Sequence, residues 1–114
     1  MMNIKIIKSI NTSKGKLFEI KVNSEVIRIV LTWHALDGAD DYNISANELL
    51  NFLIYPEEVI RGHVTRFIAH KRLNRHLARV IYEYENETVV VITFYMSHVN
   101  RYFRGGIYED KILP

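Results

Sequence analysis

The chain has 114 residues, no cysteine and a formal net charge of +2. Its length predicts a single domain that can bury a core without metal or disulfides. The absence of cysteine excludes disulfides, thiolate zinc sites and cysteine nucleophiles. The start of the chain lacks the pattern of a signal peptide, and no apolar run approaches the roughly 20 residues of a membrane span. We therefore expect a soluble cytoplasmic protein with no membrane partner.

The first half of the chain predicts strands followed by helices. The segments "NIKIIKSI" and "KLFEIKV" alternate on either side of the turn "NTSKG", and "EVIRIVLT" predicts a third strand. The period then changes, and "WHALDGADD" predicts a short helix with Thr32 as its N-cap. A second helix, "NISANELLNFLIY", carries Ser45 and Glu48 at the spacing of a capping box and ends before Pro56.

The second half of the chain predicts a meander of strands. "EVIRGHV" is short, "RFIAHKR" and "HLARVIYEY" pair across "LN", and "TVVVITFYM" follows the turn "ENE". "SHVNRYFR" predicts a terminal helix that is capped by Ser97 and stopped by Gly105 and Gly106. The final segment, "IYEDKILP", supports no assignment.

This order of elements predicts an α+β fold. Two helices cover one face of an antiparallel sheet, and a short C-terminal helix and an added N-terminal hairpin complete it. We divide the single domain of residues 1–114 into a hairpin extension at 1–24, a core at 25–104 and a tail at 105–114. The other face of the sheet is then left for solvent or for function.

The charges of the chain are unevenly distributed. No Asp or Glu lies between Val59 and Tyr82. A sign asymmetry of this kind favours an anionic partner, although a solvated basic surface is the common alternative. The basic residues of this segment are Arg61, Arg66, Lys71, Arg72, Arg75 and Arg79.

Strand alternation predicts which side chains share the uncovered face. Ala78, Val80, Tyr82 and Tyr84 are expected to meet the helices, which sends Arg79 to the other face. The same reasoning gives Val90, Ile92, Phe94 and Met96 to the core, and Val89, Val91 and Tyr95 to the uncovered face. Phe67 and Ala69 face the core, so His70 is uncovered and Lys71 points to the opposite side. Arg101, Tyr102 and Arg104 of the last helix are placed to overhang the uncovered face.

The residues His70, Arg79 and Tyr95 can support metal-independent cleavage of RNA. Arginine offers a planar fork to phosphate oxygens, histidine exchanges protons near neutral pH, and tyrosine can stack on a base or orient a proton. RNA carries its own nucleophile, the 2′-hydroxyl, so no cofactor is needed. The ordinary alternatives are an ion-paired Arg79, a polar surface His70 and a packed Tyr95.

Other catalytic patterns are absent from the sequence. The chain has no zinc-binding histidine spacing, no glycine-rich phosphate loop and no nucleophile elbow. Asp37, Asp40 and Asp41 are ordinary helix acids, so we expect no metal.

The ordered set of segments resembles the RelE/ParE-like toxin superfamily. It is most similar to a family of small bacterial and archaeal proteins placed near the BrnT toxins. The segment "TWHALDGADDYNIS" carries Thr32, His34, Ala35, Ile44 and Ser45 of that family's pattern, and has Gly38 and Tyr42 where the pattern has arginines. "YPEEVIRG", the basic hairpin and "VITFYMSHVNRYFR" follow in the family's order. The resemblance covers about residues 27–104.

The resemblance implies an mRNA-cleaving toxin that acts on free or ribosome-associated RNA and is held inactive by a small acidic antitoxin. It implies Arg79 for phosphate stabilisation, Tyr95 for stacking or proton handling, and His70 as general acid or base. The residues implied to contact RNA are Arg66, Lys71, Arg72, Arg75, Arg101 and Arg104. Two alternatives stay open: a non-catalytic module that binds nucleic acid or an acidic protein, and a homodimer formed through the N-terminal hairpin.

Overall fold

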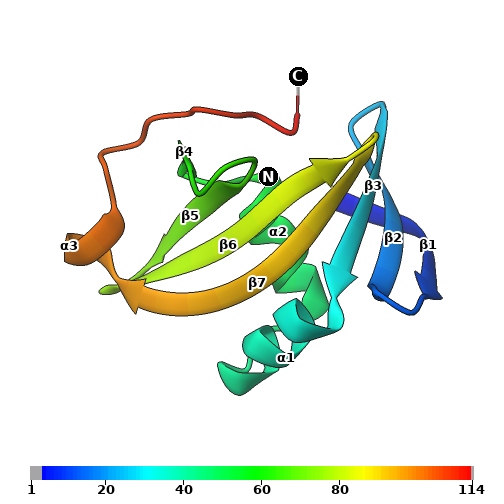
Figure 1. Cartoon of the computed structure of the whole chain (residues 1–114), viewed down its shortest axis with the longest axis horizontal. Helices are drawn as coiled ribbons and strands as arrows, with labels where there is room; N and C mark the ends of the chain where they lie inside the picture. The colour runs from blue at the N-terminus through cyan, green and yellow to red at the C-terminus, as the bar shows by residue number, and fades with distance from the viewer. Residues whose placement is uncertain (1–3, 114) are drawn as a thin grey trace.

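A computed structural model describes residues 4–113, which form one seven-stranded sheet with three helices (Figure 1). The α+β class expected from the sequence is confirmed. In chain order the elements are β1 (Ile4–Asn11), β2 (Gly15–Val22), β3 (Glu25–Thr32), α1 (Trp33–Asp41), α2 (Ala46–Ile54), β4 (Glu58–Arg61), β5 (Phe67–Leu73), β6 (His76–Glu85), β7 (Thr88–His98) and α3 (Val99–Tyr102). No helix in the described part is long and apolar enough to cross a membrane.

The sheet is antiparallel except at its centre. The strand order is β1-β2-β3-β7-β6-β5-β4, and β3 runs parallel to β7 over three residue pairs. The expectation of a wholly antiparallel sheet is therefore wrong at this junction. After β3 the chain forms the two helices and then β4 at the far edge of the sheet. The strands β5, β6 and β7 follow, each antiparallel to the one before it. β7 therefore lies beside β3 and runs parallel to it.

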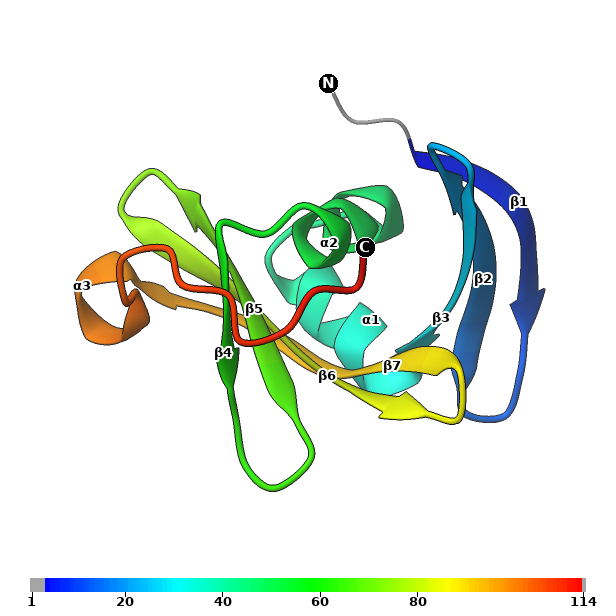
Figure 2. The ribbon, with the colours of Figure 1, turned by 90° about the horizontal axis from the view of Figure 1, so that it is seen from above.

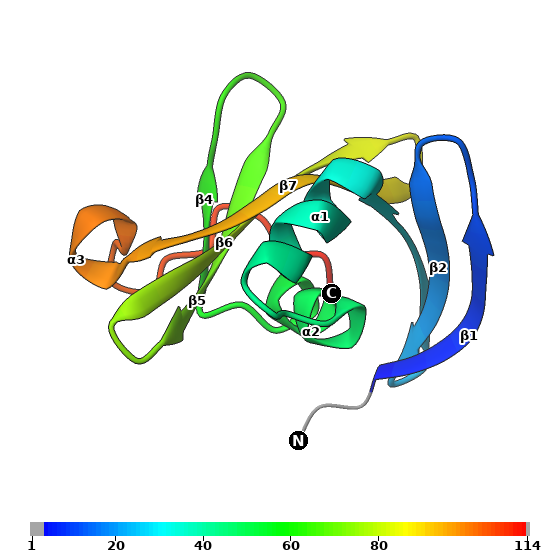
Figure 3. The same cartoon turned by 90° about the horizontal axis from the view of Figure 1, so that it is seen from below.

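The first two helices lie in the concave side of the curved sheet, as Figures 2 and 3 show from opposite directions. The N-caps predicted for these two helices are present: the Thr32 hydroxyl accepts from the Ala35 amide, and Ser45 and Glu48 form a capping box. α1 approaches β7 closely at Gly38, where an added Cβ would lie 2.5 Å from the Phe94 carbonyl oxygen. An arginine in place of Gly38, as in the family pattern, would require this backbone to shift.

One strand does not follow the predicted alternation. Ile81 pairs with Thr93 but Tyr82 pairs with Val91, so a bulge at Ile92 reverses the faces of the strand before it. Val89 and Val91 therefore join the core with Phe94, whereas the sequence assigned them to the uncovered face. A bulge cannot be recognised within a run of apolar residues, which explains why Val89 and Val91 were assigned to the wrong face.

The C-terminal helix is shorter than predicted. Ser97 pairs with Leu77 as part of β7, and the helix begins after His98, which makes no side-chain cap. Ser97 is therefore not the N-cap. The helix ends at Tyr102, and Gly105 and Gly106 follow with positive φ values of 92° and 94°.

The tail forms a strap around the outer edge of β4 (Figure 2). The Val59 amide donates to the Ile107 carbonyl at 2.9 Å, and the Glu109 amide donates to the Val59 carbonyl at 2.7 Å. On the helix side, the hydroxyls of Tyr82 and Tyr84 both donate to Asp110 Oδ2 at 2.6 Å. The sequence supported no assignment here because these contacts are almost all made with distant residues.

Candidate functional site

Four side chains form a row across four neighbouring strands on the sheet face opposite α1 and α2. Glu58 of β4 pairs with His70 of β5, His70 pairs with Arg79 of β6, and Arg79 pairs with Tyr95 of β7. Cross-strand partners project from the same face with Cβ atoms only about 5 Å apart. The structure thus brings together His70, Arg79 and Tyr95, as the alternation predicted, and adds Glu58.

The row is linked by hydrogen bonds from end to end. Arg79 Nε donates to His70 Nε2 at 3.0 Å, and His70 Nδ1 lies 2.5 Å from Glu58 Oε2. At the other end, an Nη1 proton of Arg79 is donated to the Tyr95 hydroxyl. Arginine cannot accept a hydrogen bond, so His70 Nε2 must be the acceptor and Nδ1 must carry the ring proton. His70 is therefore a neutral imidazole that donates to Glu58.

Burial and hydrogen bonding together set the protonation of His70 and Glu58. Burial lowers the pKa of His70 below its ordinary value, and the nearby Arg79 charge lowers it further, although Glu58 acts in the opposite direction. Burial alone would raise the pKa of Glu58, but hydrogen bonds from His70 and from two backbone amides outweigh it, so that pKa is lowered. A neutral histidine beside an ionised carboxylate follows.

The guanidinium of Arg79 is held on several sides but keeps one end free. Its central carbon lies 3.6 Å from the centroid of the Tyr102 ring, and Nε and Nη1 are occupied by His70 and Tyr95. The described residues give Nη2 no hydrogen bond, and none of their buried side-chain nitrogen or oxygen atoms lacks a partner. Nη2 therefore reaches solvent, although Arg79 as a whole is only 6% exposed.

The face that carries this row is covered, which corrects the expectation that it is open. His70 is fully buried, and Tyr102 overhangs Arg79 as predicted. Glu58 holds the segment that follows α3 in place over the row. Its carboxylate accepts from the backbone amides of Arg104 at 3.0 Å and Gly106 at 3.0 Å. With both ring nitrogens engaged and no exposed surface, His70 is placed to position Arg79 and not to exchange protons with a ligand.

Basic residues gather beside the row, on the side toward the β5–β6 turn and α3. Arg72 forms an ion pair with Glu57 at 3.1 Å and stacks on Phe103, with its guanidinium carbon 4.4 Å from the ring centroid. The Arg72 side chain lowers the pKa of Glu57 through its hydrogen bonds. Arg75, Arg101 and Arg104 are exposed. A depression of about 370 Å³ lies among Arg72, Asn74, Arg75, His98, Val99 and Asn100.

Two of the predicted RNA-contacting residues lie elsewhere. Arg66 directly precedes β5, at the end of that strand far from Arg72, and its Nε lies 3.5 Å from Glu83 Oε1. Lys71 points to the helix side and donates to the Tyr55 carbonyl at 3.4 Å. The structure therefore separates Arg66 and Lys71 from the basic cluster formed by Arg72, Arg75, Arg101 and Arg104.

Sequence reasoning missed Glu58 as a member of the row. Glu58 received no role from the sequence, because the pairing register of β4 with β5 cannot be read from one sequence. The sequence around His70, with Lys71 and Arg72 directly after it, gave no signal that this histidine is buried and needs a polar partner.

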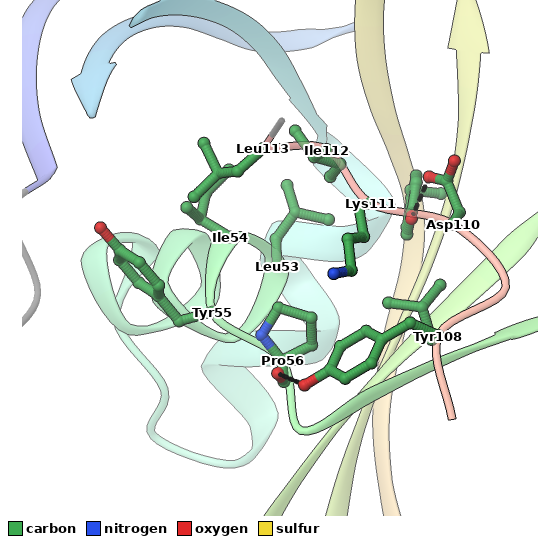
Figure 4. A pocket seen from close by; sticks show the side chains of 11 residues that line it. Leu53, Ile54, Tyr55, Pro56, Tyr108, Asp110, Lys111, Ile112 and Leu113 are labelled. Carbon is green, nitrogen blue, oxygen red and sulfur yellow. Dashed lines mark hydrogen bonds between the residues drawn. The ribbon is translucent and has the colours of Figure 1, made fainter. Parts of the chain in front are cut away.

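A separate pocket of about 370 Å³ lies on the helix side under the tail (Figure 4). Leu53, Ile54 and Leu113 contribute apolar walls, Lys111 adds one amine, and the Tyr108 hydroxyl donates to the Pro56 carbonyl at 2.8 Å. It does not share a lining residue with the row. No group of three or more His, Asp or Glu side chains within residues 4–113 could hold a metal ion.

Comparisons with protein-family models, with curated proteins and with solved structures give no match for this chain.

Proposed function

We propose that this protein binds RNA phosphates at Arg79 and acts as a metal-independent endoribonuclease of the RelE-like toxin type. The observation that carries the proposal is the solvent-facing Nη2 of an arginine whose other nitrogens are fixed by His70 and Tyr95. A fixed guanidinium loses little side-chain entropy when a phosphate arrives and donates to it in a defined direction. The basic cluster of Arg72, Arg75, Arg101 and Arg104 would hold the backbone on either side.

The chemistry assigned to the row is transesterification. The 2′-oxygen of RNA attacks the adjacent phosphorus, the bond to the 5′-oxygen breaks, and a 2′,3′-cyclic phosphate forms. Arg79 stabilises the extra negative charge on the phosphorane. The Tyr95 hydroxyl accepts from Arg79, so its own proton is free for donation to the leaving 5′-oxygen, while the 2′-hydroxyl proton passes to water. His70 and Glu58 act by positioning Arg79.

End-labelled RNA incubated with the pure protein and a chelator tests this proposal. We expect fragments that end in cyclic phosphate, and we expect Arg79→Lys to lose at least about 100-fold in rate, the usual effect of removing an aligned donor. Arg66→Lys is the matched control, because it makes the same chemical change outside the row. No cleavage of free or ribosome-bound RNA by the unaltered protein would contradict the nuclease assignment.

The second candidate is a non-catalytic module that binds RNA through the same residues. The observation that favours it is the cover: Tyr102 stacks on Arg79, and His70 has no free nitrogen. Such a module would bind RNA with an affinity that falls steeply with salt and would release the RNA intact. The assay above distinguishes the two, since only the nuclease produces cyclic-phosphate ends.

A further inference from the structure

The outer edge of β1 is a free edge of the sheet. β1 stands at the end of the strand order, and all of its residues after Ile4 are exposed. Ile6, Ile7 and Ile10 are 39%, 50% and 41% exposed, respectively. No described segment pairs with this edge. A free edge presents unpaired backbone N–H and C=O groups that can pair with another extended chain.

The opposite edge of the same sheet is covered by an acidic extended segment. The tail pairs with Val59 on both sides of Tyr108, and the Glu109 carboxylate accepts the outward amide of Arg61 at 2.7 Å. Asp110 then holds two tyrosine hydroxyls. The fold thus covers its β4 edge with the sequence "YED", and the β1 edge has no equivalent of this strap among the described residues.

The β1 edge carries positive charge and no acid. Lys5 and Lys8 lie on it, and Lys5 pairs across the strand with Lys21. Lys8 pairs with Glu19, whose carboxylate also lies 3.5 Å from an Arg28 nitrogen. An acidic strand beside β1 would therefore meet Lys5, which pairs with another lysine, and Lys8, whose partner Glu19 is shared with Arg28, and cross-strand charge pairing favours it.

A second copy of β1 fits this edge poorly. Antiparallel pairing of two β1 strands would bring Lys5 and Lys8 of both copies together, and β1 itself contributes no carboxylate to offset their charge. The bulge between Ile6 and Lys8 also interrupts the regular edge that two identical strands would need. These features disfavour self-association and leave acidic extended chains as partners.

We propose that the β1 edge binds an extended acidic segment of another protein, which adds to the sheet as a further strand. Backbone hydrogen bonds would supply affinity, Lys5 and Lys8 would select carboxylates, and the exposed isoleucines would contact alternate apolar side chains. This interaction surface is separate from the Arg79 row, so it stands or fails independently of the proposed ribonuclease activity.

Two synthetic ten-residue peptides test the proposal, one alternating valine with glutamate and the other alternating valine with lysine. We expect the glutamate peptide to bind at least about tenfold more tightly, and to slow hydrogen exchange of β1 amides in NMR spectra. The double variant K5E/K8E should reverse this preference. The double variant R66E/K111E changes the net charge equally, away from β1, and should keep the original preference.

Three results would overturn the proposal. The first is equal binding of both peptides, or no binding of either. The second is a preference that K5E/K8E leaves unchanged or that R66E/K111E also reverses. The third is protection of the β1 amides by a second copy in concentrated samples, seen as dimers in sedimentation, or by an RNA oligonucleotide in place of a peptide.

Discussion

The Nε–H of Arg79 donates to Nε2 of buried His70 at 3.0 Å, and this one bond fixes the tautomer of His70. The ring proton of His70 must then lie on Nδ1, where it is donated to Glu58. Glu58 in turn holds the backbone that follows α3. The orientation of Arg79 is thereby tied to the segment that covers it.

Removal of the His70 side chain from this row should destabilise the fold. His70→Ala leaves the Glu58 carboxylate buried with one fewer donor and frees Arg79 Nε, so we expect the free energy of unfolding to fall by about 3–5 kcal/mol. His70→Gln keeps an amide donor for Glu58 and a carbonyl acceptor for Arg79, so it should cost less than half of that. Urea unfolding followed by circular dichroism measures both. Equal losses in the two variants would show that the hydrogen bonds retained by glutamine do not stabilise the fold, and would contradict this role of His70.

Acid should weaken the protein from about neutral pH downward. The pKa of His70 is lowered in the folded state, so the unfolded chain binds more protons once the pH falls below the ordinary value of 6.5. Stability from this group is complete above that pH and is lost as the pH falls toward the folded pKa. The lowered pKa of Glu58 adds a second loss at lower pH, below its ordinary value of 4.5. Unfolding free energies measured between pH 8 and pH 4 should therefore decline, and His70→Gln should remove the first part of the decline.

The close approach of α1 to β7 predicts that Gly38 cannot carry a side chain on this backbone. Gly38→Ala should cost about 1–3 kcal/mol, because its Cβ would meet the Phe94 carbonyl oxygen. Asp40→Ala, on the exposed side of the same helix, serves as the control and should change stability by less than about 0.5 kcal/mol. Thermal denaturation compares the two. A neutral Gly38→Ala would mean that the helix moves away easily and that a larger side chain could be accommodated at this position.

Asp110 should control both the tail and two tyrosines. Burial raises the pKa of Tyr82 and of Tyr84 well above the ordinary range, and the Asp110 carboxylate raises both further. Asp110→Asn should therefore let tyrosine absorbance at 295 nm rise at lower pH than in the unaltered protein. It should also speed amide exchange at Ile107 and Glu109. An unchanged titration curve would contradict the pairing of Asp110 with the two hydroxyls.

Local rules predicted most of the elements and three of the four members of the row, His70, Arg79 and Tyr95. The Thr32 cap and the Ser45–Glu48 capping box depend on neighbours three residues apart, so the sequence alone identified them. Alternation along β5 and β6 likewise predicted that His70 and Arg79 share a face. Glu58, the bulge at Ile92 and the tail depend on strand register and on contacts between distant segments, which one sequence does not determine.

We propose that Arg79 Nη2 contacts an RNA phosphate while Nε stays bound to His70. Side-chain ¹⁵N NMR of the guanidinium groups measures this directly, with an RNA whose 2′-hydroxyls are replaced by hydrogen so that it cannot be cleaved. We predict that the Nη2 signals of Arg79 shift on titration, that its Nε–H signal changes little, and that the Arg66 signals are unaffected. If RNA left the Arg79 signals unchanged while those of exposed arginines elsewhere shifted, the proposed phosphate contact at Arg79 would be wrong.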